Sequence, residues 1–175
     1  MDFQQGLITT IHEYGITKDL INELNKGLKN RPTAILIPCL YEEFERPALK
    51  SIKEVLKNLN GLNELVIALS AKSIEQVKSA KSFFESMPFP VHLQWTNSPS
   101  VIELLKSQEK NGLELLGTPG KGWAVWQGIG VATRKSEVVA LFDADIRTFS
   151  SLYPSKMILP SVSYTHLRAH ETHEN

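Results

Sequence analysis

Four short strand-like runs, separated by segments with helical periodicity, constrain the fold of this chain more than any other feature. The runs cover residues 33–40, 62–69, 91–95 and 137–142. The first two are apolar almost throughout, which indicates strands that are buried on both faces, as in a parallel sheet. The alternation of strands and helices predicts an α/β fold with a Rossmann-like, mainly parallel sheet flanked by helices.

The helices expected around these strands have apolar residues at spacings of three and four. They extend from a cap at Thr17 or Asp19 to about Leu28, and then over 47–59, 73–86, 101–110 and 123–134, with a glycine-containing loop at 112–122. Pro47 suits a helix start, where its missing N–H costs little. We expect an N-terminal helical extension at 1–32 and one domain at 33–160.

Composition narrows the class of protein. A chain of 175 residues with 42% hydrophobic and 22% charged residues is typical of one globular domain. The formal net charge is zero, which gives no reason to expect a nucleic-acid or membrane partner. Cys39 is the one cysteine, so no internal disulfide is expected, and a cytoplasmic location is the default expectation.

Polar residues gather where the expected strands end. Pro38 to Glu42 close the first strand, Ser70 follows the second, Thr96 and Asn97 follow the third, and Asp143-Ala144-Asp145 follows the fourth. Because ligands of parallel sheets bind beyond the carboxyl ends of the strands, we expect one site at this edge.

Asp143 and Asp145 form a carboxylate pair directly after an apolar strand. Alternate residues of an extended chain point the same way, so both carboxylates can face one ligand. Hard oxygen donors suit Mg²⁺ or Mn²⁺, which can also bind diphosphate oxygens. An aspartate in a turn or helix cap is the simpler interpretation. A phosphatase or phosphotransferase with Asp143 as nucleophile is another, although such enzymes usually carry the motif on their first strand.

The segment from Gly117 to Gly122 precedes a helix and contains Lys121. Free N–H groups at a helix start and a lysine can bind an anion, although a solvated surface lysine has the same pattern. Trp123 and Trp126 in that helix suit a core or a pocket wall. The first strand is not followed by GxGxxG, which argues against a dinucleotide-binding domain.

The sequence allows two interpretations each for the cysteine and for the two glutamates at the end of the first strand. Cys39 fits a buried thiol better than a nucleophile, because no histidine partner is evident. Glu42 and Glu43 could contact a sugar or a base, or they could be solvated residues of a first helical turn.

Taken together, four motifs resemble the glucosyl-3-phosphoglycerate synthases, which are retaining glycosyltransferases of GT-A fold. The motifs are IPCLYEE at 37–43, PAL at 47–49, the Gly117–Gly122 loop with Trp126, and ALFDADI at 140–146. Their order and spacing extend the resemblance over residues 8–160. It implies metal-dependent transfer of glucose from a nucleoside-diphosphate glucose to 3-phosphoglycerate, which leads to glucosylglycerate, a compatible solute.

The resemblance also implies roles for single residues. Pro38, Cys39, Leu40 and Glu42 would border the nucleotide and the sugar, and Ser70 would lie near the base. Lys121 would approach the sugar and phosphates, Asp143 the ribose or sugar, and Asp145 the metal. The second strand ends in Ala68-Leu69-Ser70, without the aspartate that many GT-A enzymes have there. The nucleoside of the donor can therefore be either uridine or guanosine.

The segment 161–175 departs from the family pattern and resembles translated sequencing-adaptor read-through. His166 and His170 have the spacing of a helical metal site, but we expect that site to be spurious. The natural protein should then continue past residue 160, with the acceptor site and the later metal ligand of the family in the missing part. A homodimer is an expectation for the full-length protein only. A chain that binds nucleotide without turnover is the third interpretation.

Overall fold

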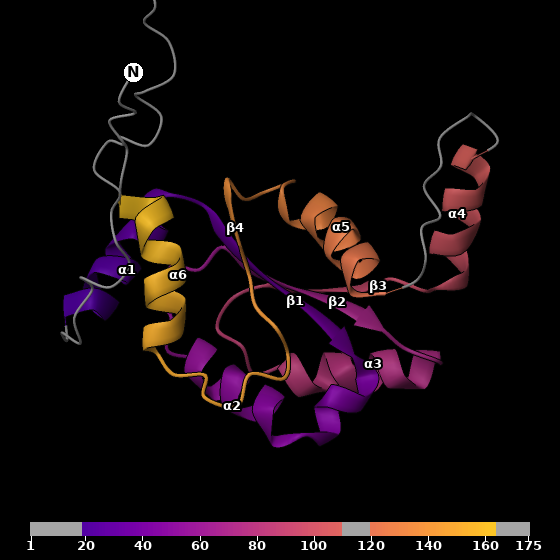
Figure 1. Cartoon of the computed structure of the whole chain (residues 1–175), viewed down its shortest axis with the longest axis horizontal. Helices are drawn as coiled ribbons and strands as arrows, with labels where there is room; N and C mark the ends of the chain where they lie inside the picture. The colour runs from indigo at the N-terminus through magenta and orange to yellow at the C-terminus, as the bar shows by residue number, and fades with distance from the viewer. Residues whose placement is uncertain (1–18, 110–119, 164–175) are drawn as a thin grey trace, which may run out of the picture.

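The computed structural model describes residues 19–109 and 120–163, and its centre is one parallel sheet. The strands are β1 (Thr33–Leu40), β2 (Glu64–Ser70), β3 (Val91–Trp95) and β4 (Val138–Leu141), in the order β3-β2-β1-β4 (Figure 1). The expected α/β class and the parallel sheet are therefore confirmed.

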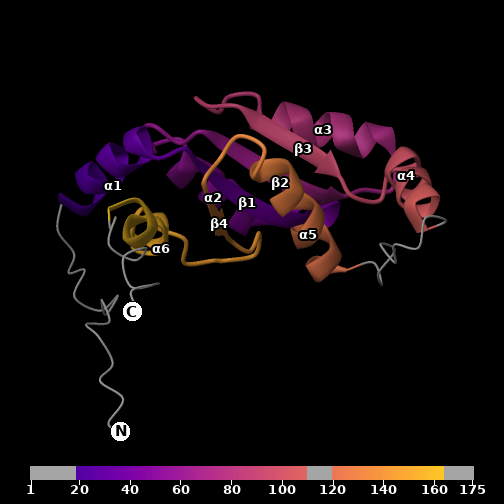
Figure 2. The ribbon, with the colours of Figure 1, turned by 90° about the horizontal axis from the view of Figure 1, so that it is seen from above.

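Helices cover both faces of the sheet. They are α1 (Asp19–Asn30), α2 (Pro47–Leu56), α3 (Ile74–Phe84), α4 (Pro99–Glu109), α5 (Lys121–Ala132) and α6 (Leu152–Ser163), and a 3₁₀ turn, η2 (Tyr41–Glu45), follows β1. In Figure 1, α5 lies over one face while α2 and α3 lie under the other. Figure 2 shows α1 and α6 side by side at the β4 end of the molecule. Within the described residues, no helix is long and apolar enough to cross a membrane.

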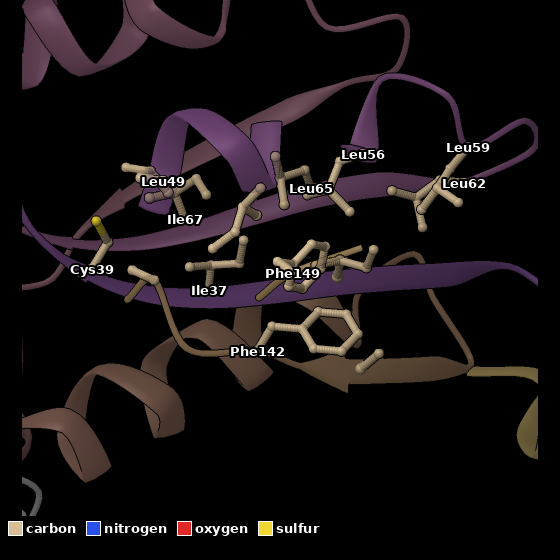
Figure 3. Close-up of a cluster of buried hydrophobic side chains, with 14 of the residues drawn as sticks. Ile37, Cys39, Leu49, Leu56, Leu59, Leu62, Leu65, Ile67, Phe142 and Phe149 are labelled. Carbon is tan, nitrogen blue, oxygen red and sulfur yellow. The ribbon is translucent and has the colours of Figure 1, made fainter. Parts of the chain in front are cut away.

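Alternate side chains of β1 build two cores, one on each face of the sheet. Ile35, Ile37 and Cys39 belong to the larger core under α2 and α3, part of which Figure 3 shows. Ala34 and Leu36 belong to the smaller core under α5. The strand is buried on both faces, as its continuous apolar sequence predicts. Each fully buried leucine or isoleucine contributes about 1.5–3 kcal/mol of transfer free energy.

Gly128 lets α5 lie close to the sheet. A Cβ atom at this position would come within 2.3 Å of Leu36 Cδ1 and 3.3 Å of Ala68 Cβ. Only a residue without a side chain fits there, so the spacing between α5 and the sheet depends on this glycine. Gly130, two residues later, has open space around it.

The chain after β4 differs from the expected outline, because the sequence patterns gave no helix over 152–163. In the structure α6 covers this range and packs against α1, where Gly27 makes room for Val162. Helix α6 thus includes the first residues of the expected non-native tail. The remainder of that tail, with His166 and His170, lies outside the described residues, and so does most of the 112–122 loop. The proposed domain division stays a prediction.

Candidate active site

The candidate site lies where the direction of strand addition reverses. From β1 the sheet extends through β2 to β3 on one side and to β4 on the other, which makes the carboxyl end of β1 the topological switch point. A cavity of about 470 Å³ opens there. Its lining residues are Pro38, Cys39, Leu40, Glu43, Ser70, Thr96, Asn97, Gly120, Lys121, Trp123, Ala124, Asp143, Ala144 and Asp145.

Pro38 helps to open this cavity. The pairing of β1 with β4 covers Thr33 to Leu36, and Phe142 N then donates to Leu36 O at 3.0 Å. Pro38 has no N–H with which to continue this ladder. The pairing of β1 with the chain that follows β4 therefore ends here, and residues of both segments line the cavity.

The loop after β4 points both aspartates into the cavity. Phe142 and Ala144 are buried, whereas Asp143 is partly exposed and Asp145 is exposed, and both aspartates line the cavity. The alternation expected from the sequence therefore holds through this loop. Phe142 packs edge-on against Phe149, with ring centroids 5.4 Å apart, and lies 5.5 Å from Tyr153. This aromatic cluster fixes the loop from behind.

The first turn of α5 faces the two aspartates. Helix α5 begins at Lys121 rather than at Trp123 as expected, with Gly120 as its N-cap. Lys121 Nζ lies 2.5 Å from Asp143 Oδ1, and both side chains are about half exposed. Asp145 is exposed. This end of the site thus combines a helix N-terminus, Lys121 and the carboxylates of Asp143 and Asp145.

These residues fit a divalent metal that shares its coordination with phosphate. No group of three or more histidine, cysteine, aspartate or glutamate side chains in described positions could enclose a metal. Mg²⁺, however, is commonly held by one or two carboxylates together with water and substrate phosphates. Asp145, with Asp143 beside it, supplies that kind of incomplete set.

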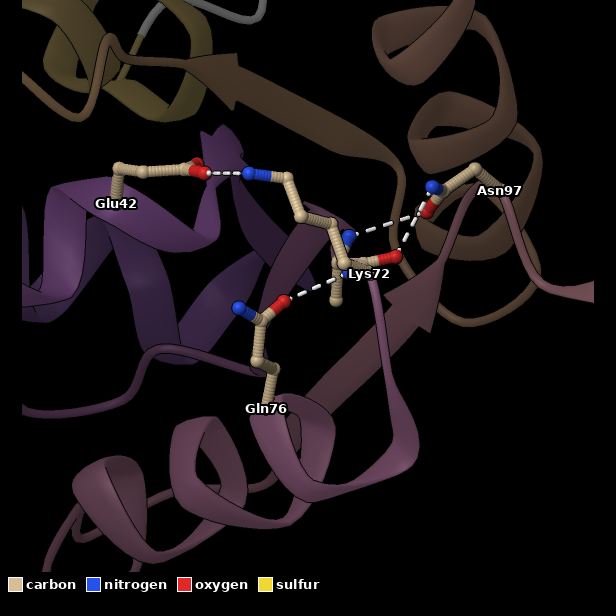
Figure 4. Close-up of polar contacts among 5 residues, drawn as sticks. Glu42, Lys72, Gln76 and Asn97 are labelled. Carbon is tan, nitrogen blue, oxygen red and sulfur yellow. Dashed lines mark hydrogen bonds and ion pairs between the residues drawn. The ribbon is translucent and has the colours of Figure 1, made fainter.

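The 3₁₀ turn η2 separates the two glutamates whose roles the sequence left open. Glu42 is exposed and its Oε1 pairs with Lys72 Nζ at 2.8 Å (Figure 4). The adjacent lysine lowers the pKa of Glu42 below its ordinary value. Glu43 is 8% exposed and lines the cavity. The structure therefore brings Glu43 to the site, and Glu42, the expected site residue, stays outside the cavity lining.

The segment after β2 is held in place by Asn97. Its side chain accepts from Ala71 N at 3.1 Å and donates to Ala71 O at 3.0 Å (Figure 4). The hydroxyl of Thr96 donates to Leu69 O at 3.1 Å. These bonds extend the contact between β2 and β3 past the last paired residues, and they hold both neighbours of Ser70, which lines the cavity.

Cys39 and the two tryptophans complete the lining. Burial, and then the nearby carboxylates of Glu43 and Glu42, raise the pKa of the Cys39 thiol to about 12. The thiol is therefore protonated at neutral pH, in agreement with a buried thiol rather than a nucleophile. Trp123 is part of the cavity wall, as expected. Trp126 is 51% exposed, so its expected place in a core or a pocket wall is wrong.

The structure thus places seven of the eight expected site residues at one cavity: Pro38, Cys39, Leu40, Ser70, Lys121, Asp143 and Asp145. It adds Glu43, which the sequence left undecided between a ligand contact and solvent. In a 3₁₀ turn, which has three residues per turn, Glu43 lies on the same side as Leu40, but the sequence alone does not show where such a turn begins.

Comparison with known proteins supports the resemblance found in the motifs. The chain is 38% identical over 163 residues to glucosyl-3-phosphoglycerate synthase of Methanococcoides burtonii, and this match covers 93% of the chain. It is 31% identical to the enzyme of the same name from Persephonella marina over 91% of the chain. The chain spans 40% of the length of each relative. No family model matches.

Solved structures show the same fold. The chain aligns with glucosyl-3-phosphoglycerate synthase of Mycobacterium tuberculosis bound to phosphoglyceric acid, with a TM-score of 0.55 and 20% identity, over 88% of this chain and 47% of that one. A second structure of that enzyme holds Mn²⁺, UDP-glucose and phosphoglyceric acid, and aligns with a TM-score of 0.53 and 19% identity over 86% and 45%. The expected GT-A fold is confirmed.

Proposed function

We propose that this chain is the donor-binding part of a glucosyl-3-phosphoglycerate synthase, which transfers glucose from a nucleoside-diphosphate glucose to 3-phosphoglycerate. The observation that carries the proposal is the meeting of Lys121, Asp143 and Asp145 at one cavity of the switch point. The relatives of that name, which match over more than nine-tenths of the chain, support it.

The charges of the cavity determine the orientation in which the nucleotide sugar would bind. The diphosphate belongs at the start of α5, where free backbone N–H groups and Lys121 attract anions. Glu43 and Ser70 lie in the part of the lining that comes from β1, η2 and β2. The nucleoside belongs there, because a carboxylate repels phosphate but accepts hydrogen bonds from hydroxyl or ring N–H groups.

Mg²⁺ or Mn²⁺ would be held by Asp145, with Asp143 beside it. When bound, the metal neutralises charge on the departing diphosphate. Lys121 stabilises the same charge from the other side, and Asp143 keeps the lysine side chain directed toward it. The fit of these residues and the Mn²⁺ in the M. tuberculosis complex both support this assignment.

Calorimetric titration with UDP-glucose and GDP-glucose, with and without Mn²⁺, tests the proposal. We expect binding that depends on the metal and that falls at least about tenfold in Asp145→Asn, because the variant loses a charged ligand. Glu54→Gln on α2 removes the same charge from an exposed residue that does not line the cavity, and this variant should bind as the wild type does. The proposal would be wrong if the affinity for the nucleotide sugar changed neither on removal of Mn²⁺ nor in Asp145→Asn.

The acceptor and the cellular setting belong to the complete protein. The M. tuberculosis structures contain phosphoglyceric acid, and we propose the same class of acceptor for the full-length relative of this chain. A cytoplasmic location is proposed on the same basis, because nucleotide sugars and phosphorylated glycerates are substrates of central metabolism. Homodimer formation stays a prediction for the full-length protein.

A further inference from the structure

Helix α5 carries a buried amide, Gln127, on the face that packs against the sheet, and this residue is 9% exposed. Its Nε2 donates to Thr96 O at 3.1 Å, and its Oε1 accepts from Gln94 Nε2 at 3.1 Å. Because a carbonyl can only accept, the bond to Thr96 fixes which way round the amide lies. Gln127 therefore joins α5 to β3 and to Thr96, which follows β3 and lines the cavity.

The carbonyl of Thr96 accepts from α5 because the ladder between β2 and β3 ends just before it. The last bond of that ladder runs from Thr96 N to Leu69 O. The next bond would join Ala71 N to Thr96 O, but Ala71 N donates to Asn97 Oδ1 instead. Gln127 thus supplies a hydrogen bond that the sheet no longer gives to this residue of the cavity wall.

The apolar packing of α5 fixes its distance from the sheet but resists rotation only weakly. Four of the six buried residues in the smaller core are alanines, and small side chains form shallow ridges and grooves. The closest approach lies at Gly128, over Leu36 of β1 and Ala68 of β2. A helix held at one point can still tilt about that point. The hydrogen bonds of Gln127 add a second, directional contact at β3.

The direction of α5 decides where Lys121 lies. At 1.5 Å per residue, Lys121 lies about 9 Å from Gln127 along the helix axis. A tilt of about 10° around Gln127 would therefore displace the helix start by roughly 1.5 Å. Since a misplacement of about 1 Å can cost a site much of its activity, a loosely held α5 would not keep Lys121 opposite Asp143.

We propose that Gln127 is a positioning residue for the donor diphosphate, and that its two hydrogen bonds hold α5 in the direction that places Lys121 at the cavity. Gln127 itself is not among the residues that line the cavity, so it acts through Lys121 and not by contact with the ligand. Single buried polar residues are known to fix the register of packed helices at a cost in stability. This assignment rests on the proposed function.

A double-mutant cycle separates this role from a purely structural one. Gln127→Met keeps an unbranched side chain of similar size and removes both hydrogen bonds, and it is combined with Lys121→Gln. The wild type, the two single variants and the double variant are titrated with UDP or GDP, whichever the wild type binds, in the presence of Mn²⁺. Circular dichroism and urea unfolding show beforehand that each protein is folded.

Ser136→Ala is the matched control, because it also removes hydrogen bonds of a buried side chain. The hydroxyl of Ser136 accepts from Asn63 Nδ2 at 2.9 Å and donates to Glu64 Oε1 at 3.4 Å. Glu64 is the first residue of β2, so this cluster lies at the opposite end of the sheet from the cavity. The control should lose stability but keep its affinity for nucleotide within about twofold of the wild type.

We expect Gln127→Met to weaken nucleotide binding about three- to thirtyfold, the usual range for a residue that acts on a site without touching the ligand. In the Lys121→Gln background the same change should cost less than about twofold, because the side chain through which Gln127 acts is already absent. A purely structural role would instead lower the affinity by the same factor in both backgrounds.

An unchanged affinity in Gln127→Met, or an equal loss in both backgrounds, would overturn the inference and leave the proposed function standing. Absence of Mn²⁺-dependent binding in the wild type would instead remove the proposed function, and this inference with it. Should Gln127→Met fail to fold, Gln127→Asn takes its place in the cycle, because it keeps the amide but withdraws it by one methylene. The same two results in that variant count against the inference.

Discussion

Lys121 Nζ lies 2.5 Å from Asp143 Oδ1, although the two residues come from opposite walls of the cavity. One belongs to the first turn of α5 and the other to the loop after β4. Because both side chains are about half exposed, the pair contributes little to stability. Its importance lies in the position that it gives to Lys121, the only cation among the described residues that line the cavity.

Lys121→Gln should therefore weaken nucleotide binding while leaving the stability of the fold almost unchanged. We expect the free energy of unfolding to change by less than about 0.5 kcal/mol, as for most surface substitutions. Nucleotide affinity should fall about tenfold, because a charge-assisted contact with phosphate is lost. Calorimetry at two salt concentrations measures this, and the wild type should lose more affinity with salt than the variant.

Lys135→Gln is the matched control, since it removes the same charge from the exposed segment that follows α5. Its affinity for nucleotide should equal that of the wild type. Equal losses in the two lysine variants would mean that net charge, and not the position of Lys121, attracts the ligand.

Gly128→Ala should destabilise the fold. The new Cβ would meet Leu36 Cδ1 at 2.3 Å, and Leu36 is fully buried, so either α5 or the core must shift at a cost of about 1–3 kcal/mol. Gly130→Ala makes the same change where nothing lies within 4 Å, and it should stabilise α5 by up to about 1 kcal/mol. Urea unfolding of the two variants should give opposite signs, and matching signs would contradict this account of α5.

Cys39 should resist thiol reagents until the protein unfolds. Its pKa is raised from 9.0 to about 12 by burial and by the carboxylates of Glu43 and Glu42, so the reactive thiolate is scarce at pH 8. We expect slow labelling by a chromogenic disulfide in buffer and rapid labelling in concentrated urea. Labelling in buffer as fast as that of a free thiol would show that the thiol is not held in the interior.

The same pKa predicts how stability depends on pH. Between pH 9 and pH 12 the folded chain keeps a proton on Cys39 that the unfolded chain releases, so stability from this group falls as the pH rises through this range. Cys39→Ser lacks the thiol titration and should show a shallower decline in melting temperature above pH 9. Parallel curves for the two proteins would speak against a buried thiol.

Asn97→Ala should loosen the segment after β2 without disturbing the sheet. The variant loses both hydrogen bonds to the Ala71 backbone, each worth about 1 kcal/mol. Hydrogen exchange at the Ala71 amide should accelerate, while the amides in the middle of β2 keep their protection. Ser100→Ala, at an exposed position on α4, should leave the Ala71 amide unchanged.

The positions of the strands could be predicted from the sequence because each strand has its own apolar pattern. The predicted range 91–95 has the same bounds as β3 in the structure, and the predicted range 33–40 has the same bounds as β1. The order β3-β2-β1-β4 could not be inferred from the residues, because it depends on which neighbour each strand meets after folding. Helix α6 was missed since Pro154 and Pro160 interrupt its pattern, and packing against α1 outweighs their cost.

The residues of the candidate site could be predicted from the sequence where the alternation of a strand alone decides the side to which a side chain points. Asp143 and Asp145 follow a strand, so their alternation carried over into the loop. Glu42 and Glu43 occupy a 3₁₀ turn, in which one residue of difference changes the side that a side chain faces. The local sequence YEEFE does not fix the start of that turn, and for this reason the structure was needed to separate the exposed glutamate from the buried one.

The placement of β4 beside β1 also has a consequence for the time at which the cavity forms. Pro38 and Glu43 leave the ribosome well before Asp143 and Asp145, because Asp143 lies about 100 residues after Glu43 in the chain. Contacts of such long sequence separation form late, because the loop between them must be closed first. Until β4 has been synthesised, the edge of β1 that faces away from β2 has no neighbouring strand. In that interval the nascent chain is most exposed to pairing with a strand of another chain.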